Sequence, residues 1–147
     1  LVLKNKYMKN IVLLILLIFI ASSCDGSKTS KTPDSQFIGN WVLSERGMFN
    51  GVEIEIKKQS EGVYFGEITK LNDNKYVMMF MQNGDKFISS IKRKSNFEFT
   101  INEIKIASPL FSAYGQSTTA EFKAAFDGKD KIMLGNNGSE GFYTRIK

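Results

Sequence analysis

Histidine is absent from this 147-residue sequence, and cysteine occurs only once. Without an imidazole, the chain cannot build a Ser-His-Asp triad, a histidine-ligated zinc site or an acid–base pair that needs histidine. A single cysteine cannot form a disulfide within the chain and cannot supply a Cys-x-x-Cys motif. These two absences exclude many common classes of enzyme and metal-binding protein.

Recognisable catalytic motifs are missing as well. No Gly-x-Ser-x-Gly segment or phosphate-cradling glycine loop occurs, and Ser89-Ser90 has no histidine to activate it. Residues 127–130 lack the alternating oxygen ligands and the closing glutamate of a calcium loop, so they predict a hairpin turn. Glu53 and Glu55 alternate with apolar residues beside Lys57, which favours a solvated face over a catalytic carboxylate pair. We therefore expect no enzyme, cofactor or metal site.

The N-terminal segment has the three parts of a secretory signal. Three lysines precede an unbroken apolar run over residues 11–20, and Ala-Ser-Ser follows directly. This run is too short to span a bilayer, which takes about 20 apolar residues. The sequence predicts a signal peptide over residues 1–23, with Met8 as an alternative translation start.

The end of this signal resembles a bacterial lipobox. Small residues stand at 21–23, where the signal peptidase must approach the backbone, and Cys24 follows as the lipidated thiol. The two serines are similar to the relaxed lipoboxes of Bacteroidetes-type bacteria. The resemblance implies a diacylglycerol anchor on Cys24 and a place in the cell envelope, in the outer membrane of a Gram-negative bacterium. The alternative is an ordinary secretory signal cut near Ala21 or Ser23, with Cys24 as an incidental thiol.

A polar segment follows the cysteine. Residues 24–35 contain no large apolar side chain, so they bury too little surface to offset their ordering entropy and predict a flexible tether. The net charge of +5 also belongs largely to the signal. Cleavage of the signal would remove three of the 20 basic residues, so the mature chain would contain 17 basic and 15 acidic residues. We therefore attribute the basicity to export and expect no nucleic-acid partner; the basic run 92–94 is expected to be a solvated hairpin tip.

The remaining residues, 36–147, alternate apolar and polar side chains with the period of a β-strand. The clearest runs lie at 52–57, 97–102 and 120–127. Weaker runs bring the total to about nine candidate strands, and these are 41–46, 63–70, 75–82, 86–93, 131–135 and 141–147.

Asn-Gly and Asp-Gly pairs mark turns at residues 50–51, 83–84, 127–128 and 137–138, because they accept the positive φ of a tight hairpin. Short strands joined by such turns predict an all-β domain. We expect an antiparallel up-and-down meander of about eight or nine strands, closed as a barrel, with a β-sandwich as the alternative. Residues 103–118 are the least regular, and their later part is expected to form a longer loop over one end.

The two ends of this domain carry a further pattern. It begins with Gly39-Asn-Trp41, and Arg145 lies in its last strand-like run. This pattern resembles the lipocalins and the wider calycin group, in which the tryptophan plugs the closed end of the barrel and the arginine packs across it. The resemblance implies that Gly39 permits close approach, that Trp41 seals the barrel floor and that Arg145 lies on the indole face. The alternative is a core tryptophan and a solvated arginine.

The segment 76–81 is apolar on both faces of its expected strand. A strand with one wet face should alternate, so its second face must be covered or must line a binding surface. Methionine suits irregular ligand surfaces because its side chain is flexible and polarizable. We expect the 103–118 loop to cover this strand, and we keep a ligand or partner surface as the alternative. The residues of that candidate surface are Tyr76, Met78, Met79, Phe80 and Met81.

Two functions fit these observations. The first is a lipid-anchored, lipocalin-like binding protein of the cell envelope, which takes a small apolar ligand or an envelope component. An eight-stranded barrel has an interior that is either filled by side chains or just able to hold one small ligand. The second is an envelope interaction protein or inhibitor with a solid core, whose function lies on its outer surface.

Overall fold

The computed structural model describes residues 30–147. The predicted signal peptide and Cys24 lie outside these residues. Among residues 30–147, no helix is both long enough and apolar enough to cross a membrane.

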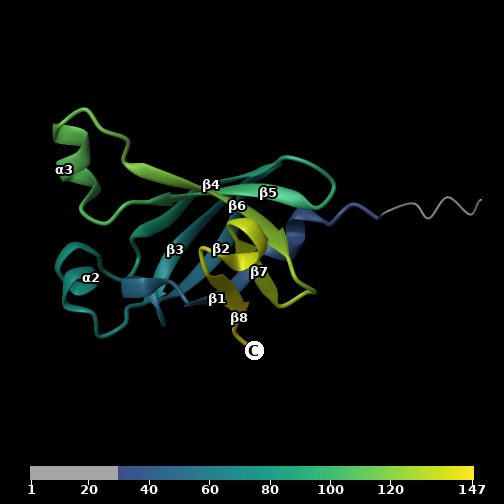
Figure 1. The fold of residues 1–147 in the computed structure, drawn as a ribbon, viewed down its shortest axis with the longest axis horizontal. Helices are drawn as coiled ribbons and strands as arrows, with labels where there is room; N and C mark the ends of the chain where they lie inside the picture. The colour runs from purple at the N-terminus through teal and green to yellow at the C-terminus, as the bar shows by residue number, and fades with distance from the viewer. Residues whose placement is uncertain (1–29) are drawn as a thin grey trace, which may run out of the picture. The chain divides into compact units, whose positions relative to one another are not determined.

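Eight antiparallel strands, each bonded to the next in sequence, close into a barrel through the pairing of the first with the last (Figure 1). The all-β meander barrel expected from the sequence is therefore confirmed, with eight strands. Their bounds are β1 (Gly39–Ser44), β2 (Glu53–Ser60), β3 (Val63–Lys70), β4 (Lys86–Arg93), β5 (Glu98–Ile104), β6 (Thr119–Phe126), β7 (Lys131–Leu134) and β8 (Phe142–Arg145).

Alternation along the strands decides which side chains face the interior. In β5, Phe99 and Ile101 are buried on the inner face, and in β2 the buried residues are Ile54 and Ile56. Of the four dipeptides expected in tight hairpins, only Asp127-Gly128 lies in one, between β6 and β7. The other three lie in the longer connections after β1, β3 and β7, where Asn137 and Gly138 still have positive φ, at 54° and 83°.

The two ends of the barrel differ in how their strands are connected. At one end the connections carry short helices, and we call it the helical end. The other end has tight turns after β2, β4 and β6 and receives the chain from the N-terminus, and we call it the N-terminal end. The helices of the first three connections at the helical end are η2 (Gly47–Phe49), α2 (Lys75–Phe80) and α3 (Ser108–Ala113), and η3 (Asn136–Gly138) lies in the fourth.

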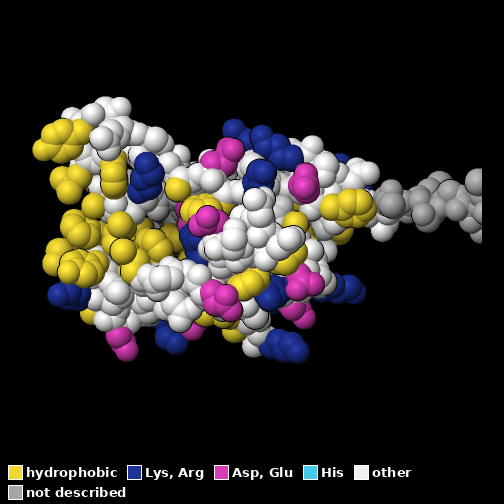
Figure 2. Space-filling view, viewed as in Figure 1, with side chains coloured by type: hydrophobic (Ala, Val, Ile, Leu, Met, Phe, Trp, Pro, Cys, Tyr) yellow, Lys and Arg dark blue, Asp and Glu magenta, His cyan; other side chains and the backbone are white. Residues whose placement is uncertain are grey.

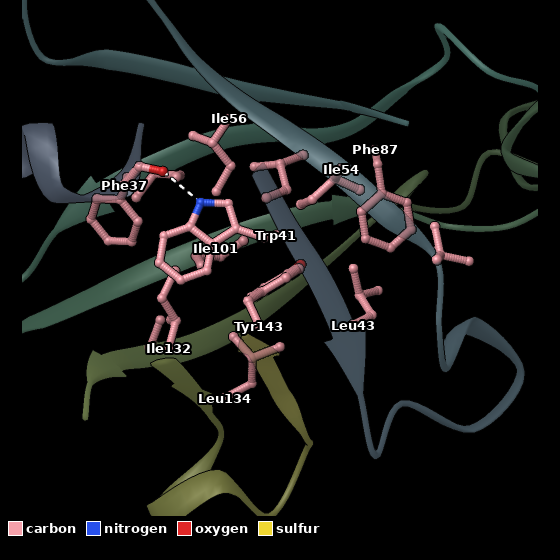
Figure 3. Close-up of a cluster of buried hydrophobic side chains, with 14 of the residues drawn as sticks. Phe37, Trp41, Leu43, Ile54, Ile56, Phe87, Ile101, Ile132, Leu134 and Tyr143 are labelled. Carbon is pink, nitrogen blue, oxygen red and sulfur yellow. Dashed lines mark hydrogen bonds between the residues drawn. The ribbon is translucent and has the colours of Figure 1, made fainter. Parts of the chain in front are cut away.

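The interior of the barrel is filled by large apolar side chains from nearly every strand (Figure 3). Trp41 and Tyr143 are its largest members, and both are fully buried. Aromatic rings pack against one another at the N-terminal end, where Phe37 meets Phe99 edge-on with a centroid distance of 4.7 Å. Edge-to-face contacts of this kind are favoured by the ring quadrupoles.

The strand expected at 75–82 is wrong, because the structure has the helix α2 there. The Asn74 side chain accepts hydrogen bonds from the backbone N–H groups of Tyr76 and Val77, which is the bonding of a helix N-cap. Val77 and Met81, four residues apart, are buried on the side that faces the barrel. The apolar residues between them therefore face outward, which produces the two-faced pattern that we interpreted as a strand.

The 103–118 segment divides between two structures. Its first two residues complete β5, and α3 occupies part of the expected loop at the helical end. The helix begins after Ala107, whose φ of 56° turns the chain sharply. This segment therefore contains a short helix, which the sequence did not predict because its apolar residues show no sustained helical periodicity.

The chain joins the barrel before residue 36. The Thr32 backbone N–H donates to the carbonyl of Asn96 at 3.0 Å, and Asp34 begins the short helix η1 (Asp34–Phe37). The Arg93 guanidinium forms an ion pair with Asp34 and donates to the Thr32 carbonyl. Arg93, from the basic run 92–94, therefore ties the entering chain to the N-terminal end instead of extending into solvent.

Candidate functional site

Trp41 and Arg145 face each other across the first and last strands, at the N-terminal end. They are directly paired in the β1–β8 register. The guanidinium carbon of Arg145 lies 4.1 Å from the centroid of the indole ring. The indole N–H donates to the Phe37 carbonyl at 2.8 Å, so no polar atom of this buried ring lacks a partner (Figure 3).

The Arg145 guanidinium also binds the chain that crosses this end of the barrel. It donates to the carbonyls of Gln36 at 2.6 Å and Ile38 at 3.0 Å, and it forms an ion pair with Asp130 at 3.2 Å. Gly39 makes this approach possible, because a Cβ there would lie 2.7 Å from Arg145 Nη1. These contacts close the barrel floor and leave no group of Arg145 free for a ligand.

A buried charged cluster lies inside the barrel, toward the helical end. The Arg46 guanidinium donates to the Glu103 carboxylate, and the Tyr143 hydroxyl donates to the other oxygen of the same carboxylate. The side chains of Arg46 and Glu103 are only 7% and 5% exposed. Arg46 also donates to the carbonyl of Glu140 at 2.6 Å and lies 4.6 Å from the ring centroid of Phe122.

Burial dominates the electrostatics of this cluster. Loss of water raises the pKa of the Glu103 carboxyl, and the nearby Arg46 charge and the Tyr143 hydrogen bond offset only part of that effect. Burial also raises the pKa of Tyr143 well above its ordinary value, and the Glu103 charge adds to the shift. The phenol therefore stays protonated and continues to donate to the carboxylate at neutral pH.

Sequence reasoning missed this cluster, although one signal was available. Glu103 continues the alternation of Phe99 and Ile101, so it occupies a position that faces the barrel interior. An acidic residue at such a position requires a cationic or hydrogen-bonding partner. The identity of that partner, Arg46 in the β1–β2 connection, depends on tertiary structure and had no local signal.

The helical end exposes a cluster of large apolar side chains, which we call the apolar end surface. Figure 2 shows these side chains gathered over α2 and α3. Met79 is 67% exposed and Tyr114 is 81% exposed. Four of the five candidate surface residues belong to it, whereas Met81 is buried against the barrel. Its members are Met48, Tyr76, Met78, Met79, Phe80, Leu110 and Tyr114.

A small groove adjoins the apolar end surface. Its volume is about 300 Å³, and it lies between the end of α2 and the start of α3. Phe80, Met81, Ile104 and Pro109 provide apolar walls. A space of this size suits one or two side chains of a partner or a small apolar molecule, at the lower limit of ligand pockets.

Charges of both signs surround the apolar end surface. Two of its lysines lie over aromatic rings, because Lys75 Nζ is 4.9 Å from the Tyr76 centroid and Lys105 Nζ is 5.0 Å from the Phe111 centroid. Neither sign dominates. The charged residues of the first three connections are Arg46, Lys75 and Lys105 against Glu45, Asp73 and Asp85.

The other residues that the sequence singled out lie in ordinary surface structure. Glu55 and Lys57 form an ion pair at 3.2 Å on the outer face of β2, and Lys57 also binds Glu67. Residues 127–130 form the turn between β6 and β7. Within residues 30–147, no group of three acidic, cysteine or histidine side chains is placed to hold a metal ion.

Comparison of the whole chain with protein-family models, with curated proteins and with solved structures finds no match.

Proposed function

We propose that the protein is a lipid-anchored, lipocalin-like member of the cell envelope that binds an envelope protein through its apolar end surface. The single observation that carries this proposal is the exposure of Met78, Met79 and Phe80 on α2, together with Leu110 and Tyr114 at α3. Contiguous exposed apolar side chains on a folded domain commonly mark an interaction site. Methionine and aromatic side chains are enriched in the cores of protein interfaces.

The filled interior favours the outer surface over the lumen. Trp41, Leu43 and Tyr143 meet within the barrel, together with isoleucines from several strands (Figure 3). A ligand in the lumen would have to displace such side chains, and cavities or rearrangements in a packed core cost several kcal/mol. The predicted alternative of a solid-core interaction protein therefore has the stronger support.

The charges favour a protein partner over an anionic lipid surface. Peripheral membrane binding to anionic lipids relies on an excess of basic residues near the apolar side chains. Here Lys75 of the β3–β4 connection and Lys86 at the start of β4 are matched by Asp73 and Asp85 of that connection. A surface with both signs around an apolar centre fits the polar rim of a protein interface.

The direction of the tether supports the same choice. The chain enters the barrel at the N-terminal end, where Thr32 binds Asn96, and the apolar end surface lies at the other end. Eight residues lead from Cys24 to Thr32 and reach at most about 29 Å. A lipid on Cys24 would therefore attach the barrel through its N-terminal end, so the apolar end surface is not needed for membrane attachment and is left for a partner.

In-cell photo-crosslinking tests the proposal. A photoreactive amino acid replaces Met79 in the full chain, and a second variant carries it at Phe97, an exposed apolar residue at the N-terminal end. We expect one discrete cross-linked protein from position 79 and none of that size from position 97. The same product from both positions, or none from position 79, would contradict the proposal.

The anchor has its own test. Replacement of Cys24 with serine should move the chain from the membrane fraction to the soluble fraction and should remove the mass of a diacylglycerol. An unchanged mass in the wild-type chain would mean that Cys24 is an incidental thiol. The cross-link from position 79 reports on the partner separately from this result.

A small apolar ligand in the groove beside α2 is the second candidate. Phe80, Met81, Ile104 and Pro109 provide the apolar lining that favours it. Native mass spectrometry of the purified chain would detect a retained molecule. Replacement of Pro109 with a bulky tryptophan should release a molecule held there, because Pro109 lines the groove and is itself exposed.

A further inference from the structure

A groove on the outer face of the barrel runs from the turn after β4 to the η3 turn. It lies over β5, β6 and β7 and has a volume of about 620 Å³, which falls within the range of small-molecule sites. Its main polar side chains point outward from alternate positions of the strands. These side chains are Glu98 and Thr100 from β5, and Glu121 and Lys123 from β6.

Small side chains and an early end of β7 create the groove. Thr100 pairs with Lys123, and Ala125 pairs with both Glu98 and Met133, so the floor holds a threonine and an alanine between longer residues. β7 has only four residues, and the η3 turn then forms one wall of the groove. Asn137 in that turn has a φ of 54°, a conformation that suits asparagine better than most residues.

The Thr100 hydroxyl on the floor has no hydrogen-bond partner. Thr100 is only 4% exposed, and its Oγ1 atom is fully buried. Buried hydroxyls in proteins are nearly always hydrogen-bonded, and leaving one unpaired costs about 1–3 kcal/mol. Because Oγ1 has no exposed surface, a bound molecule or its water can supply the missing partner only when the Lys92 and Lys123 side chains, which flank Thr100 in the sheet register, move aside.

The charged side chains of the groove are also without partners. No ion pair is formed by Glu98, Glu121, Lys94 or Lys123 among the described residues, although all four line the groove. The outer face of β2 and β3 behaves differently, because Lys57 there contacts both Glu55 and Glu67. Carboxylates and ammonium groups of the groove are therefore both available to an incoming ligand.

We propose that this groove binds a short saccharide. Sugar hydroxyls both donate and accept, so they can donate to Glu98 or Glu121 and accept from Lys123 or Lys94. The Thr100 hydroxyl and the Asn136 and Asn137 amides add further groups of both kinds. Met133 and Ala125 offer an apolar area to the C–H face of a sugar ring.

The composition of the groove disfavours other ligand classes. Two carboxylates repel a phosphate or another simple anion, and two ammonium groups repel a simple cation. The groove is also separate from the apolar end surface, since its residues come from the strand faces and η3 rather than from α2 and α3. Saccharide binding in this groove can therefore be tested independently of protein binding at the apolar end surface.

NMR titration of the purified full chain tests this proposal. The probes are chitotriose and maltotriose, with inorganic phosphate as a comparison. We expect a trisaccharide to shift the amide signals of residues 98–100, 121–125 and 133–137 in a saturable way. Phosphate alone shifting these signals, or no shift with either trisaccharide, would overturn the proposal.

Two variants assign the binding to the groove. Thr100→Val removes the hydroxyl with little change in shape and should weaken trisaccharide binding about fivefold, the value of one neutral hydrogen bond. Lys123→Ala should weaken it further, whereas Lys57→Ala on the β2–β3 face should leave it unchanged. Without a ligand, Thr100→Val should be at least as stable as the wild type, because the hydroxyl that it loses has no partner. Equal affinity in all three variants would place the saccharide elsewhere and contradict the assignment.

Discussion

The guanidinium of Arg46 binds the carboxylate of Glu103 inside the barrel, with both side chains less than a tenth exposed. Arg46 comes from the connection after β1, and Glu103 lies in β5 on the barrel wall. The pair therefore fastens a connection of the helical end to the interior of the sheet. Its energetics differ from those of the exposed pairs elsewhere, because water cannot take the place of a missing partner.

Replacement of Arg46 with alanine should destabilise the domain strongly. It leaves the Glu103 carboxylate buried without its cation, a change that typically costs about 3–5 kcal/mol. Chemical unfolding in urea measures the loss. The double replacement Arg46→Met with Glu103→Leu should lose much less, since no buried charge remains unpaired. A double variant less stable than Arg46→Ala would contradict this explanation.

The titration of Glu103 should contribute to the pH dependence of the free energy of unfolding. Its pKa is raised in the folded state, mainly by burial, so the folded state holds the proton more tightly than the unfolded state. The corresponding stabilisation is complete below the ordinary carboxyl pKa of 4.5 and is lost as the pH rises through the folded-state pKa. Glu103→Gln removes this titration. The stability of the wild type relative to Glu103→Gln should therefore fall as the pH rises through that window, and a constant difference would contradict the assignment.

Replacement of Arg145 with alanine should loosen the barrel floor. The variant loses a cation–π contact worth about 0.5–2 kcal/mol and leaves the Gln36 and Ile38 carbonyls without their donor. We expect a lower urea midpoint and a red shift of tryptophan fluorescence, because Trp41 is the only tryptophan and water gains access to it. Arg145→Lys keeps the charge and should show an intermediate effect. An unshifted emission spectrum in Arg145→Ala would contradict the proposed loosening.

Gly39 and Gly62 offer a matched pair of glycines at the same end of the barrel. Both have positive φ, at 131° and 69°, but only at Gly39 would an added Cβ meet another group, Arg145 Nη1 at 2.7 Å. Gly62→Ala should cost about 1–2 kcal/mol through backbone strain alone. Gly39→Ala should cost more, because its φ of 131° lies outside the left-handed region that alanine can adopt and because the new Cβ displaces Arg145. Equal losses in the two variants, measured by thermal unfolding, would show that the close approach is not important.

Asn74→Ala should unwind α2 without unfolding the barrel. The variant removes the acceptor for the Tyr76 and Val77 N–H groups, a loss of about 1 kcal/mol for an N-cap. We expect faster amide exchange within Lys75–Phe80 and unchanged exchange in the strands. Asn74→Asp keeps the acceptor and should restore protection. Increased exchange across the whole barrel would contradict a local role.

The barrel was predictable because its information is local. Alternation in runs such as 52–57 and 97–102 indicates which face of a strand is buried, and Asp127-Gly128 marks the tight turn between β6 and β7. The meander needs little more, since each strand pairs with the next one in sequence. Among the described strands, the one pairing between strands distant in sequence is that of β1 with β8, which closes the barrel.

The helix at 75–80 was not predictable from alternation. The six apolar or aromatic residues of 76–81 look alike as a short strand and as one and a half turns of helix, because neither period repeats often enough to be seen. The distinguishing signal is Asn74, which the sequence presents equally well as a turn residue or a helix cap. The burial of Val77 and Met81, four residues apart, was visible only after folding.

The two proposed binding surfaces also differ in how much of each was visible in the sequence. The apolar residues of α2 were noticed because they form a run in the sequence, although their secondary structure was wrong. The outer groove brings together residues from 94–100, 121–125 and 133–137, and each of them resembles an ordinary solvated position in its own strand. Only the sheet register places Thr100 beside Lys123 and Ala125 beside Met133.

The bond from Arg145 to the Ile38 carbonyl joins positions 107 residues apart, and the last strand completes the barrel by pairing with the first. Closure of such a long loop carries a large entropic cost, which is recovered only when the final contacts form. The barrel therefore cannot be completed until β8 is free to pair with β1. Until β8 arrives, β1 presents an open edge and Trp41 has no cover, so this is the interval in which a folding chain most needs protection from aggregation.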